Sequence, residues 1–304
     1  MTFQLTILGC NSAIPTINRK PTAQLLNVAE RFFLIDCGEG TQLQLRKYKI
    51  KMQNIHHIFI SHLHGDHYFG LIGFISTMHL LGREKELHIY APSKLKEIIY
   101  IQLEASGTEL RFPLFFHEFG FYESEHLLES SDLNVFTIPL KHSIPCCGFL
   151  FKEKPKKRRI IKDKIDQYHI PVDQLSSIKD GEDYILNDGR VIPNVELTSE
   201  PQISRSFAFC SDTAYCESII SQIRGVDMLY HEATYLDELK DRAHKTMHST
   251  AKEEAIIAKK SKVKKLIIGH YSQRYFDLNP LLKEAQSVFK DSFLAIEGEK
   301  FSVK

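Results

Sequence analysis

Four residues of types that commonly bind metal ions lie within six consecutive positions of the segment SHLHGDH, residues 61–67. They are His62, His64, Asp66 and His67. Imidazole nitrogens and carboxylate oxygens are usual protein ligands of zinc. A single histidine at such a place is more often a surface or hydrogen-bonded residue. Four ligand-type residues at this spacing, across a turn that contains a glycine, instead indicate a metal site.

The local chain path explains how these four side chains can converge. The preceding segment HHIFIS, residues 56–61, is predicted to be a β-strand, and alternate side chains of an extended chain point the same way. His62 and His64 should therefore share one side. Gly65 permits a sharp turn, from which Asp66 and His67 can reach the same cavity. Each pair could bind one ion.

Three further residues of metal-ligand type follow apolar runs, each at the carboxyl end of a predicted strand: His142, Asp212 and His270. Each is a weak indication by itself, but with residues 61–67 they are predicted to form one cavity rim. The two carboxylate oxygens of Asp212 could bridge two ions. Ions about 3.5–4 Å apart can lower the pKa of a bridging water and grip phosphate oxygens. This chemistry suits phosphodiester hydrolysis.

The elements that must position these residues alternate between strands and helices. Strands are predicted over residues 3–8, 23–28, 31–36, 56–61, 87–91, 134–140, 147–151, 207–211, 227–231, 265–269 and 293–297. Helices are predicted over residues 40–48, 67–82, 93–106, 216–224, 249–260 and 279–289. The helix over 67–82 is apolar on nearly all sides, so we expect it to be buried. Two β-rich halves with helices outside favour a four-layer αβ/βα sandwich.

Residues 152–204 interrupt this alternation and are interpreted as an insertion that projects from the main body. Residues 152–164 contain eight Lys or Arg and two acidic residues, whereas the rest of the chain contains 31 basic and 36 acidic residues. Charge runs are usually solvated surfaces, but a concentrated basic segment can also steer a polyanion. The candidates for phosphate contacts are Lys154, Lys156, Lys157, Arg158 and Arg159.

The composition is that of an ordinary globular protein. The chain has 304 residues, of which 43% are hydrophobic and 25% charged, and its net charge is +1. No apolar run approaches the ~20 residues of a membrane-spanning helix, and the N-terminus lacks the features of a signal peptide. The six cysteines form no CxxC pair. We therefore expect reduced thiols in a cytoplasmic protein that does not enter a membrane.

Motifs across residues 9–275 resemble the metallo-β-lactamase superfamily and, within it, ribonuclease Z, the endoribonuclease that removes the 3′ trailer of precursor tRNA. They are IDCGEGTQ (35–42), HLHGDHYFGL (62–71), KHSIPCCGF (141–149), SDT (211–213), HEAT (231–234), HST (248–250) and HYSQRY (270–275). HEAT, HST and HYSQRY are the most specific to ribonuclease Z. The first loop, GCNSAIP, departs from the commoner GTGSAxP at Cys10 and Asn11.

The resemblance implies a single α/β domain of the metallo-β-lactamase fold over residues 1–304, with a tRNA-binding arm inserted at about 152–195. In the family the arm often reaches tRNA from the partner subunit of a homodimer. The family's arm is often rich in Gly and Pro, whereas this one is rich in Lys and Arg.

The resemblance also implies two Zn²⁺ ions per subunit, and Mn²⁺ or Co²⁺ would suit the same nitrogen and oxygen ligands. One ion would be held by His62, His64, His142 and Asp212. The other would be held by Asp66, His67, Asp212 and His270.

Two residues, Asp66 and His248, are candidates for proton transfer. By the resemblance, Asp66 would accept a proton from the attacking water, or would only orient that water while the ions activate it. His248, oriented by Glu232, would donate a proton to the leaving oxygen, because a carboxylate partner fixes the imidazole tautomer and raises its pKa. Alternatively, His248 is only a residue near a helix N-terminus. Arg274 would contact a phosphate or form a surface salt bridge.

Two other functions remain open at the level of sequence. A small-molecule hydrolase of the same fold, such as an arylsulfatase-like or cyclic-phosphodiesterase enzyme, would need the ions but not the arm. A non-catalytic RNA-binding relative is disfavoured because all seven ligand positions are intact.

Overall fold

The computed structural model describes residues 2–304 and divides them into two compact units. The first unit contains the residues up to 129 together with 135–151 and 205–304. The second contains residues 130–134 and 152–204, and so includes the whole predicted insertion. All six cysteines are free thiols, as predicted, and five of them are buried.

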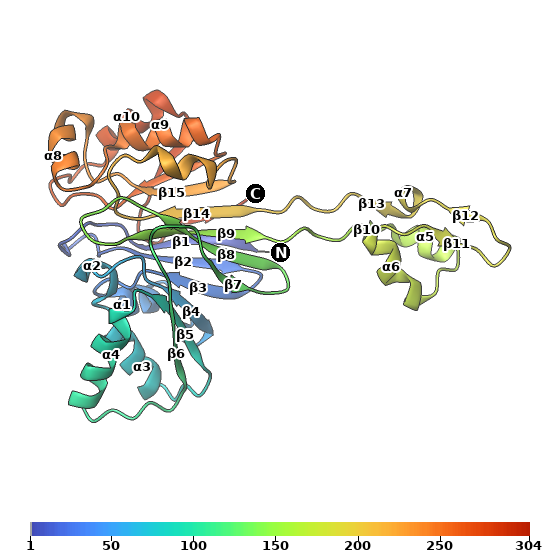
Figure 1. Ribbon diagram of the computed structural model, residues 1–304, viewed down its shortest axis with the longest axis horizontal. Helices are drawn as coiled ribbons and strands as arrows, with labels where there is room; N and C mark the ends of the chain where they lie inside the picture. The colour runs from blue at the N-terminus through green and yellow to red at the C-terminus, as the bar shows by residue number, and fades with distance from the viewer. Residues whose placement is uncertain (1) are drawn as a thin grey trace. The chain divides into compact units, whose positions relative to one another are not determined.

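A seven-stranded mixed sheet forms one half of the first unit (Figure 1). Its strand order is β18-β1-β2-β3-β4-β5-β6. The strands are β1 (Phe3–Gly9), β2 (Ala23–Val28), β3 (Arg31–Ile35), β4 (Ile55–Phe59), β5 (Leu87–Ala91), β6 (Leu114–Glu118) and β18 (Lys300–Ser302). The pairs from β18 to β3 are antiparallel, and those from β3 to β6 are parallel.

A second seven-stranded sheet has the order β17-β16-β15-β14-β9-β8-β7. Its strands are β7 (His126–Glu129), β8 (Leu133–Pro139), β9 (Cys147–Glu153), β14 (Ser206–Cys210), β15 (Met228–Glu232), β16 (Leu266–Gly269) and β17 (Ser292–Leu294). Strands β14 to β17 are parallel. Aromatic rings join the two sheets, since Phe59 of the first sheet contacts Phe149 and Phe151 of the second with ring centroids 5.3 Å apart.

Helices cover the outer faces of the two sheets (Figure 1). The first sheet is flanked by α1 (Thr41–Lys47), α3 (Leu71–Leu80) and α4 (Lys94–Ala105), and the second by α9 (Ala251–Ser261) and α10 (Asn279–Val288). Shorter elements are η1 (Met52–Asn54), α2 (Gly65–Tyr68), η3 (Glu217–Ser221), η4 (Asp237–Leu239) and α8 (Lys240–Lys245). This arrangement is the predicted four-layer αβ/βα sandwich, the metallo-β-lactamase fold.

The helix predicted over residues 67–82 is instead two helices, α2 and α3. They are separated at Gly70, where a Cβ atom would lie 2.1 Å from the carbonyl oxygen of Gly38. The helix is therefore interrupted where the two backbones meet. The prediction that this segment is buried holds for one face of α3, where Leu71, Phe74, Ile75 and Met78 are buried, but not at its end, where the Leu80 side chain is 81% exposed.

Several other element predictions differ from the structure. Within the helix predicted over residues 216–224, Glu217–Ser221 form the 3₁₀ segment η3 rather than an α-helix. Strands β6, β7 and β18 and helix α8 were not predicted, because these short segments lack the regular alternation of apolar and polar residues that marks longer ones.

The second unit is a small folded body with its own core. Its elements are β10 (Arg159–Ile160), α5 (Lys162–Gln167), η2 (Val172–Gln174), α6 (Leu175–Asp180), β11 (Tyr184–Ile185), β12 (Val191–Ile192), α7 (Asn194–Leu197) and β13 (Thr198–Ser199). The core residues Ile170, Ile178 and Leu197 are buried. The buried Asn194 amide donates to the carbonyl oxygens of Ile178 and Glu182, each at 2.7 Å. These hydrogen bonds link α7 to α6 and to the loop that follows α6.

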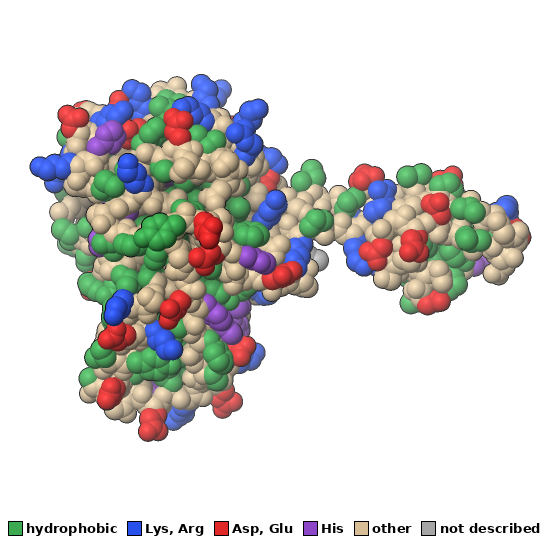
Figure 2. Space-filling model, in the orientation of Figure 1, with side chains coloured by type: hydrophobic (Ala, Val, Ile, Leu, Met, Phe, Trp, Pro, Cys, Tyr) green, Lys and Arg blue, Asp and Glu red, His purple; other side chains and the backbone are tan. Residues whose placement is uncertain are grey.

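Acidic residues offset the basic charge of the second unit. Residues 152–204 contain ten Lys or Arg and ten Asp or Glu, and Figure 2 shows both kinds of side chain on its surface. Three of the predicted phosphate-contacting cations form ion pairs within the unit, at 2.7–2.8 Å: Lys156 with Glu153, Lys157 with Asp180, and Arg158 with Glu200.

Within residues 2–304, every helix is too short or too polar to cross a lipid bilayer.

Candidate metal centre and active site

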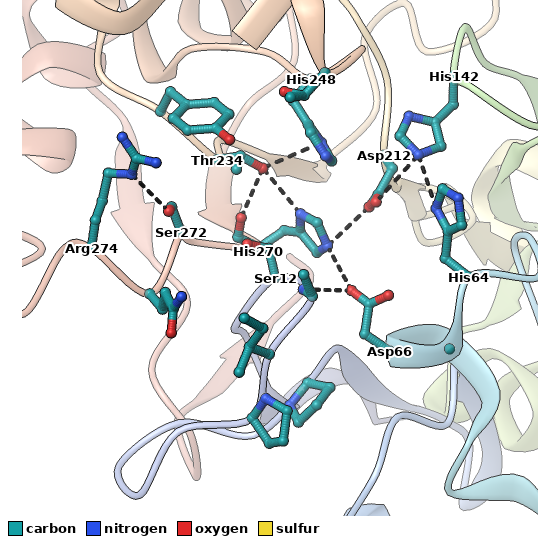
Figure 3. A pocket seen from close by; sticks show the side chains of 18 of the residues that line it. Ser12, His64, Asp66, His142, Asp212, Thr234, His248, His270, Ser272 and Arg274 are labelled. Atoms are coloured by element: carbon teal, nitrogen blue, oxygen red, sulfur yellow. Dashed lines mark hydrogen bonds and ion pairs between the residues drawn. The ribbon is translucent and has the colours of Figure 1, made fainter. Parts of the chain in front are cut away.

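The seven predicted metal ligands converge at one edge of the two sheets, within the first unit. They follow or belong to five different elements, which are β4, α2, β8, β14 and β16. Figure 3 shows five of these side chains pointing toward one another: His64, Asp66, His142, Asp212 and His270. The sequence prediction that these separate strand ends form one rim therefore agrees with the geometry.

The first group of donor atoms consists of His62 Nε2, His64 Nδ1, His142 Nε2 and Asp212 Oδ2. His64 Nδ1 lies 3.1 Å from both other imidazole nitrogens. Asp212 Oδ2 lies 3.7 Å from His62 Nε2 and from His142 Nε2. A tetrahedral ion with bonds of about 2.0–2.1 Å holds its ligands about 3.3 Å apart. The group therefore has the dimensions of a tetrahedral metal site.

The second group consists of Asp66 Oδ2, His67 Nε2, His270 Nε2 and the other oxygen of Asp212, Oδ1. Asp212 Oδ1 lies 3.3 Å from His67 Nε2 and 3.1 Å from His270 Nε2. Asp66 Oδ2 lies 3.5 Å from the same two nitrogens. Asp212 thus presents one oxygen to each group, which is the arrangement that a bridging carboxylate requires.

Two buried nitrogen atoms of the second group need a cation. Among residues 2–304, His67 Nε2 and His270 Nε2 have no hydrogen-bond partner. A buried polar atom left unpaired costs about 1–3 kcal/mol, and the nearby Asp66 and Asp212 carboxylates would repel each other without a positive charge between them. A divalent metal ion satisfies all of these atoms, so the residues present fit a metal centre.

Hydrogen bonds at the opposite ring nitrogens orient the histidine ligands. His67 Nδ1 lies 2.7 Å from Asp36 Oδ2, His142 Nδ1 lies 2.9 Å from the carbonyl oxygen of Met247, and His270 Nδ1 lies 3.0 Å from Thr234 Oγ1. With Nδ1 as the donor, the Nε2 lone pair faces the centre. Such outer partners hold the tautomer and raise the ligand's basicity.

Asp36 is a functional residue that the sequence analysis missed. It is fully buried directly after β3, and it also accepts the backbone N–H of Ser61 at 2.8 Å and its hydroxyl at 3.0 Å. The available signal was the motif IDCGEGTQ, which places a carboxylate after an apolar strand. Asp36 therefore fixes both His67 and the start of the ligand segment.

The predicted pair of His248 and Glu232 lies beside the metal ligands. His248 Nδ1 is 2.8 Å from Glu232 Oε1, and the His248 ring centroid is 5.1 Å from that of His142 and 5.5 Å from that of His270. Burial by itself would lower the pKa of His248. The charge of Glu232 and its hydrogen bond outweigh this effect and, with Asp212, raise that pKa to about 9.

Glu232 is a fully buried carboxylate that is held by several donors. Its oxygens accept the backbone N–H groups of Thr213, Thr234 and Ser249, at 3.0–3.3 Å. The Thr234 hydroxyl donates to Oε2 at 2.7 Å. These donors stabilise the ionised form of Glu232, so it can hold a protonated imidazole at Oε1.

A cleft of about 950 Å³ opens over the centre. Asp66, His248 and Arg274 line it together with Arg242 of α8, which the sequence analysis did not single out. The Arg274 Nε donates to Ser272 Oγ at 3.0 Å, and its guanidinium lies over the Tyr235 ring at 5.1 Å. Among residues 2–304, Arg274 has no carboxylate partner. Its positive charge is therefore available to an anion in the cleft that it lines.

Asp66 is oriented by the loop that follows β1. The backbone N–H of Ala13 donates to Asp66 Oδ2 at 2.7 Å, and Ala13 adopts a left-handed conformation with φ of 52° to do so. This contact fixes the same carboxylate oxygen that faces His67 and His270.

The chain is similar to several known proteins. Residues 3–188 match the family described as Anti-Pycsar protein Apyc1. A protein named Ribonuclease Z from Bacteroides thetaiotaomicron is 48% identical over 296 residues, which is 97% of this chain and 94% of that protein. Another Ribonuclease Z, from Cytophaga hutchinsonii, is 49% identical over 304 residues, covering 100% of this chain and 97% of the other.

Two solved structures share the fold over nearly the whole chain. The short form of human tRNase Z superposes with a TM-score of 0.73 at 27% identity, covering 99% of each chain. The metallo-beta-lactamase fold protein YhfI from Bacillus subtilis superposes with a TM-score of 0.70 at 18% identity, covering 99% of this chain and all of that one.

Proposed function

This chain belongs to the ribonuclease Z family and, over residues 3–188, to the family described as Anti-Pycsar protein Apyc1. From this membership we propose that it is a metal-dependent endoribonuclease that removes the 3′ trailer of precursor tRNA. The observation that carries this proposal is that the Asp212 carboxylate lies between the two groups of donor atoms. Each of its oxygens belongs to a separate group of donor atoms, and His248 and Glu232 lie beside both groups.

We assign the two groups to two Zn²⁺ ions per subunit, with Mn²⁺ or Co²⁺ as other ions that suit nitrogen and oxygen ligands. When bound, such ions lower the pKa of a water molecule between them and neutralise charge on the phosphate. His62, His64, His142 and Asp212 would hold one ion. Asp66, His67, His270 and Asp212 would hold the other.

His248 would supply the proton that the leaving oxygen needs. Its Nδ1 is engaged by Glu232, so Nε2 is the atom available to a substrate in the cleft that the residue lines. The oxygen of a water molecule bonds to phosphorus, the P–O3′ bond breaks, and the proton goes to O3′. The tRNA is left with a 3′-hydroxyl, and the phosphate stays on the trailer.

Asp66 and Arg274 would act on the other reacting groups. Asp66 would accept the proton of the attacking water or, since its Oδ2 is already held by Ala13 and faces two ligands, would only orient that water. Arg274 would bind a phosphate oxygen, because its guanidinium lines the cleft without a carboxylate partner among the described residues.

The second unit would supply further contacts with the tRNA. Lys154, Lys156, Lys157, Arg158 and Arg159 were predicted as phosphate contacts, and three of them already have acidic partners. The proposal therefore rests more on Arg159 than on the paired cations, since Arg159 is exposed. In keeping with the family, we propose that the protein is a cytoplasmic homodimer.

A small-molecule phosphodiesterase is the second candidate. It is favoured by the fact that every proposed metal ligand and both proton-transfer residues lie in the first unit. A hydrolase of this kind would not need the second unit.

The two candidates differ in what removal of the second unit would do. Residues 152–195 would be replaced by a short linker, and cleavage of a tRNA precursor with a 3′ trailer would be compared with hydrolysis of bis(p-nitrophenyl) phosphate. Loss of the first activity with retention of the second is expected. Equal loss of both, or no cleavage of the precursor by the intact protein, would favour the small-molecule hydrolase.

A further inference from the structure

Phe69 is an exposed aromatic residue on the segment that carries four of the metal ligands. It directly follows α2 and is 61% exposed, although its neighbours at positions 67 and 71 are buried. Its side chain lines the cleft together with His64 and Asp66. Exposed apolar side chains are ordinary on a protein surface, but this one lies inside the proposed substrate cleft.

The ring of Phe69 is held directly against the ligand turn. A Cβ atom on Gly65 would lie 2.1 Å from Phe69 Cε2 and 2.3 Å from Cζ, so the ring occupies the space that any other residue at position 65 would need. Gly65 lies between the ligands His64 and Asp66 in the chain. The ring therefore packs against the backbone of Gly65. Because the side chain is largely exposed, much of the ring surface is open to the cleft.

The surroundings of this ring suit a flat apolar ligand. Tyr68 contacts Phe69 edge-on, with ring centroids 5.0 Å apart, which restricts the ring. Ile14 and Phe276, which are 51% and 92% exposed, also line the cleft. The cleft thus contains apolar side chains as well as the proposed metal ligands. Single-stranded RNA ends offer unstacked bases, which proteins bind by stacking them on aromatic rings.

We propose that Phe69 is a stacking platform for a nucleobase within two nucleotides of the scissile phosphate. This inference rests on the proposed function, because it requires an RNA substrate. Phe69 would position the substrate rather than take part in proton transfer. Because Phe69 lies next to the ligand turn, a base stacked on it would help to fix the position of the scissile phosphate.

The direct test combines a protein change with a substrate change. Phe69→Ala is expected to lower kcat/KM for a tRNA precursor by roughly 5- to 150-fold, the range of stacking on one base. The same variant is then measured on four precursors, each with one abasic nucleotide at one of the two positions on either side of the cleavage point. For one of these precursors, wild-type and variant enzymes should have the same kcat/KM.

Two variants separate stacking from packing on Gly65. Phe69→Tyr retains an aromatic ring and should keep most of the activity, whereas Phe69→Leu fills apolar space without a ring and should behave like Phe69→Ala. Leu43→Ala is the matched control, because Leu43 of α1 is 62% exposed and is not among the residues lining the cleft. It should leave kcat/KM unchanged.

The metal content of each variant decides between the remaining outcomes. If Phe69→Ala binds as much metal as the wild-type protein but loses the same factor on all abasic precursors as on the intact one, the stacking proposal is wrong. Loss of metal in Phe69→Ala and Phe69→Leu alike would also overturn it, since the ring would then act only on the ligand turn. Failure of the wild-type protein to cleave the intact precursor would instead contradict the proposed function.

Discussion

The Thr234 hydroxyl joins the proton-transfer pair to a metal ligand. It donates to Glu232 Oε2 at 2.7 Å and lies 3.0 Å from His270 Nδ1, whose N–H it can accept. Figure 3 shows Thr234 between His248 and His270. One carboxylate therefore orients the proposed acid directly and a ligand of the second donor group through one hydroxyl.

Thr234→Val should weaken the second metal site selectively. The substitution keeps the shape but removes the partner of His270 Nδ1, and loss of such an outer partner lowers metal affinity by about 10- to 100-fold. Calorimetric titration of the metal-free protein with Zn²⁺ should show one weakened site and one unchanged site, with Thr234→Ser close to wild type. Thr137→Val, a buried control in β8, should not alter either site. Equal weakening of both sites would contradict this role.

His248→Ala should lower the rate without releasing metal. A general acid contributes about 10²- to 10⁴-fold to the rate, so kcat for a tRNA precursor should fall by that factor. Metal analysis should still find the wild-type content, because His248 is not among the proposed ligands. Near-normal turnover would remove His248 from the proposed mechanism.

Glu232→Gln should shift the pH dependence of the reaction. A general acid must be protonated, so the rate should fall as pH rises through the pKa of His248. Because the Glu232 charge raises that pKa, its removal should move this fall to lower pH. The measurement is kcat against pH for both proteins. A fall at the same pH in both would mean that another group gives it.

The sequence indicated the proposed ligands more clearly than the residues that orient them. The seven proposed ligands are of recognisable types, and they either lie in the segment SHLHGDH or follow an apolar run at the end of a strand. Asp36 also follows an apolar strand, but it contacts only one of the proposed ligands, His67. The Met247 carbonyl is a backbone group, so no side-chain type could have indicated it.

At the scale of elements, the break between α2 and α3 places the ligand turn. Gly70 is the residue before α3, and its backbone N–H donates to the Cys37 carbonyl oxygen at 2.9 Å. The loop after β3 and the start of α3 thus lie in direct contact. Only a residue without a side chain fits between them.

Gly70→Ala should therefore destabilise the protein. The added methyl group would lie 2.1 Å from the Gly38 carbonyl oxygen, so the backbone must move. Such overpacking typically costs about 1–3 kcal/mol, measured as a lower Tm. Gly73→Ala in the same helix is the control, because its methyl group would meet only the flexible Gln42 side chain, at 3.3 Å. An equal change in Tm for both variants would contradict this account of the break.

Some short elements carry no periodic pattern of apolar residues and so could not be predicted. Helix α8 (Lys240–Lys245) buries only Ala243, so no apolar stripe marks it in the sequence. Yet α8 carries Arg242 into the cleft. Strand β18 has only three residues and was missed for the same reason.

At the scale of the whole molecule, the charge of the second unit could not be read from its basic segment alone. The acidic partners Asp180 and Glu200 lie 23 and 42 residues beyond Lys157 and Arg158, respectively. Only folding brings them together. Basic and acidic residues are equal in number over 152–204, so this segment has no net positive charge to attract RNA over long distances, and the RNA contacts proposed for it would be local.

The four-layer arrangement could be predicted because its strands and helices are long enough to show their periods. The resemblance of the motifs then supplied the fold in detail. The internal structure of the second unit was not predictable, since its strands have two residues each and its core rests on residues as far apart as Ile170 and Leu197.

We propose that Asp212 joins two metal sites built from seven side chains. Crystals grown with Zn²⁺ and measured at the zinc absorption edge test it directly. Two anomalous peaks are expected, one among His62, His64, His142 and Asp212 and the other among Asp66, His67, His270 and Asp212. A single peak, or peaks that do not share Asp212, would contradict it.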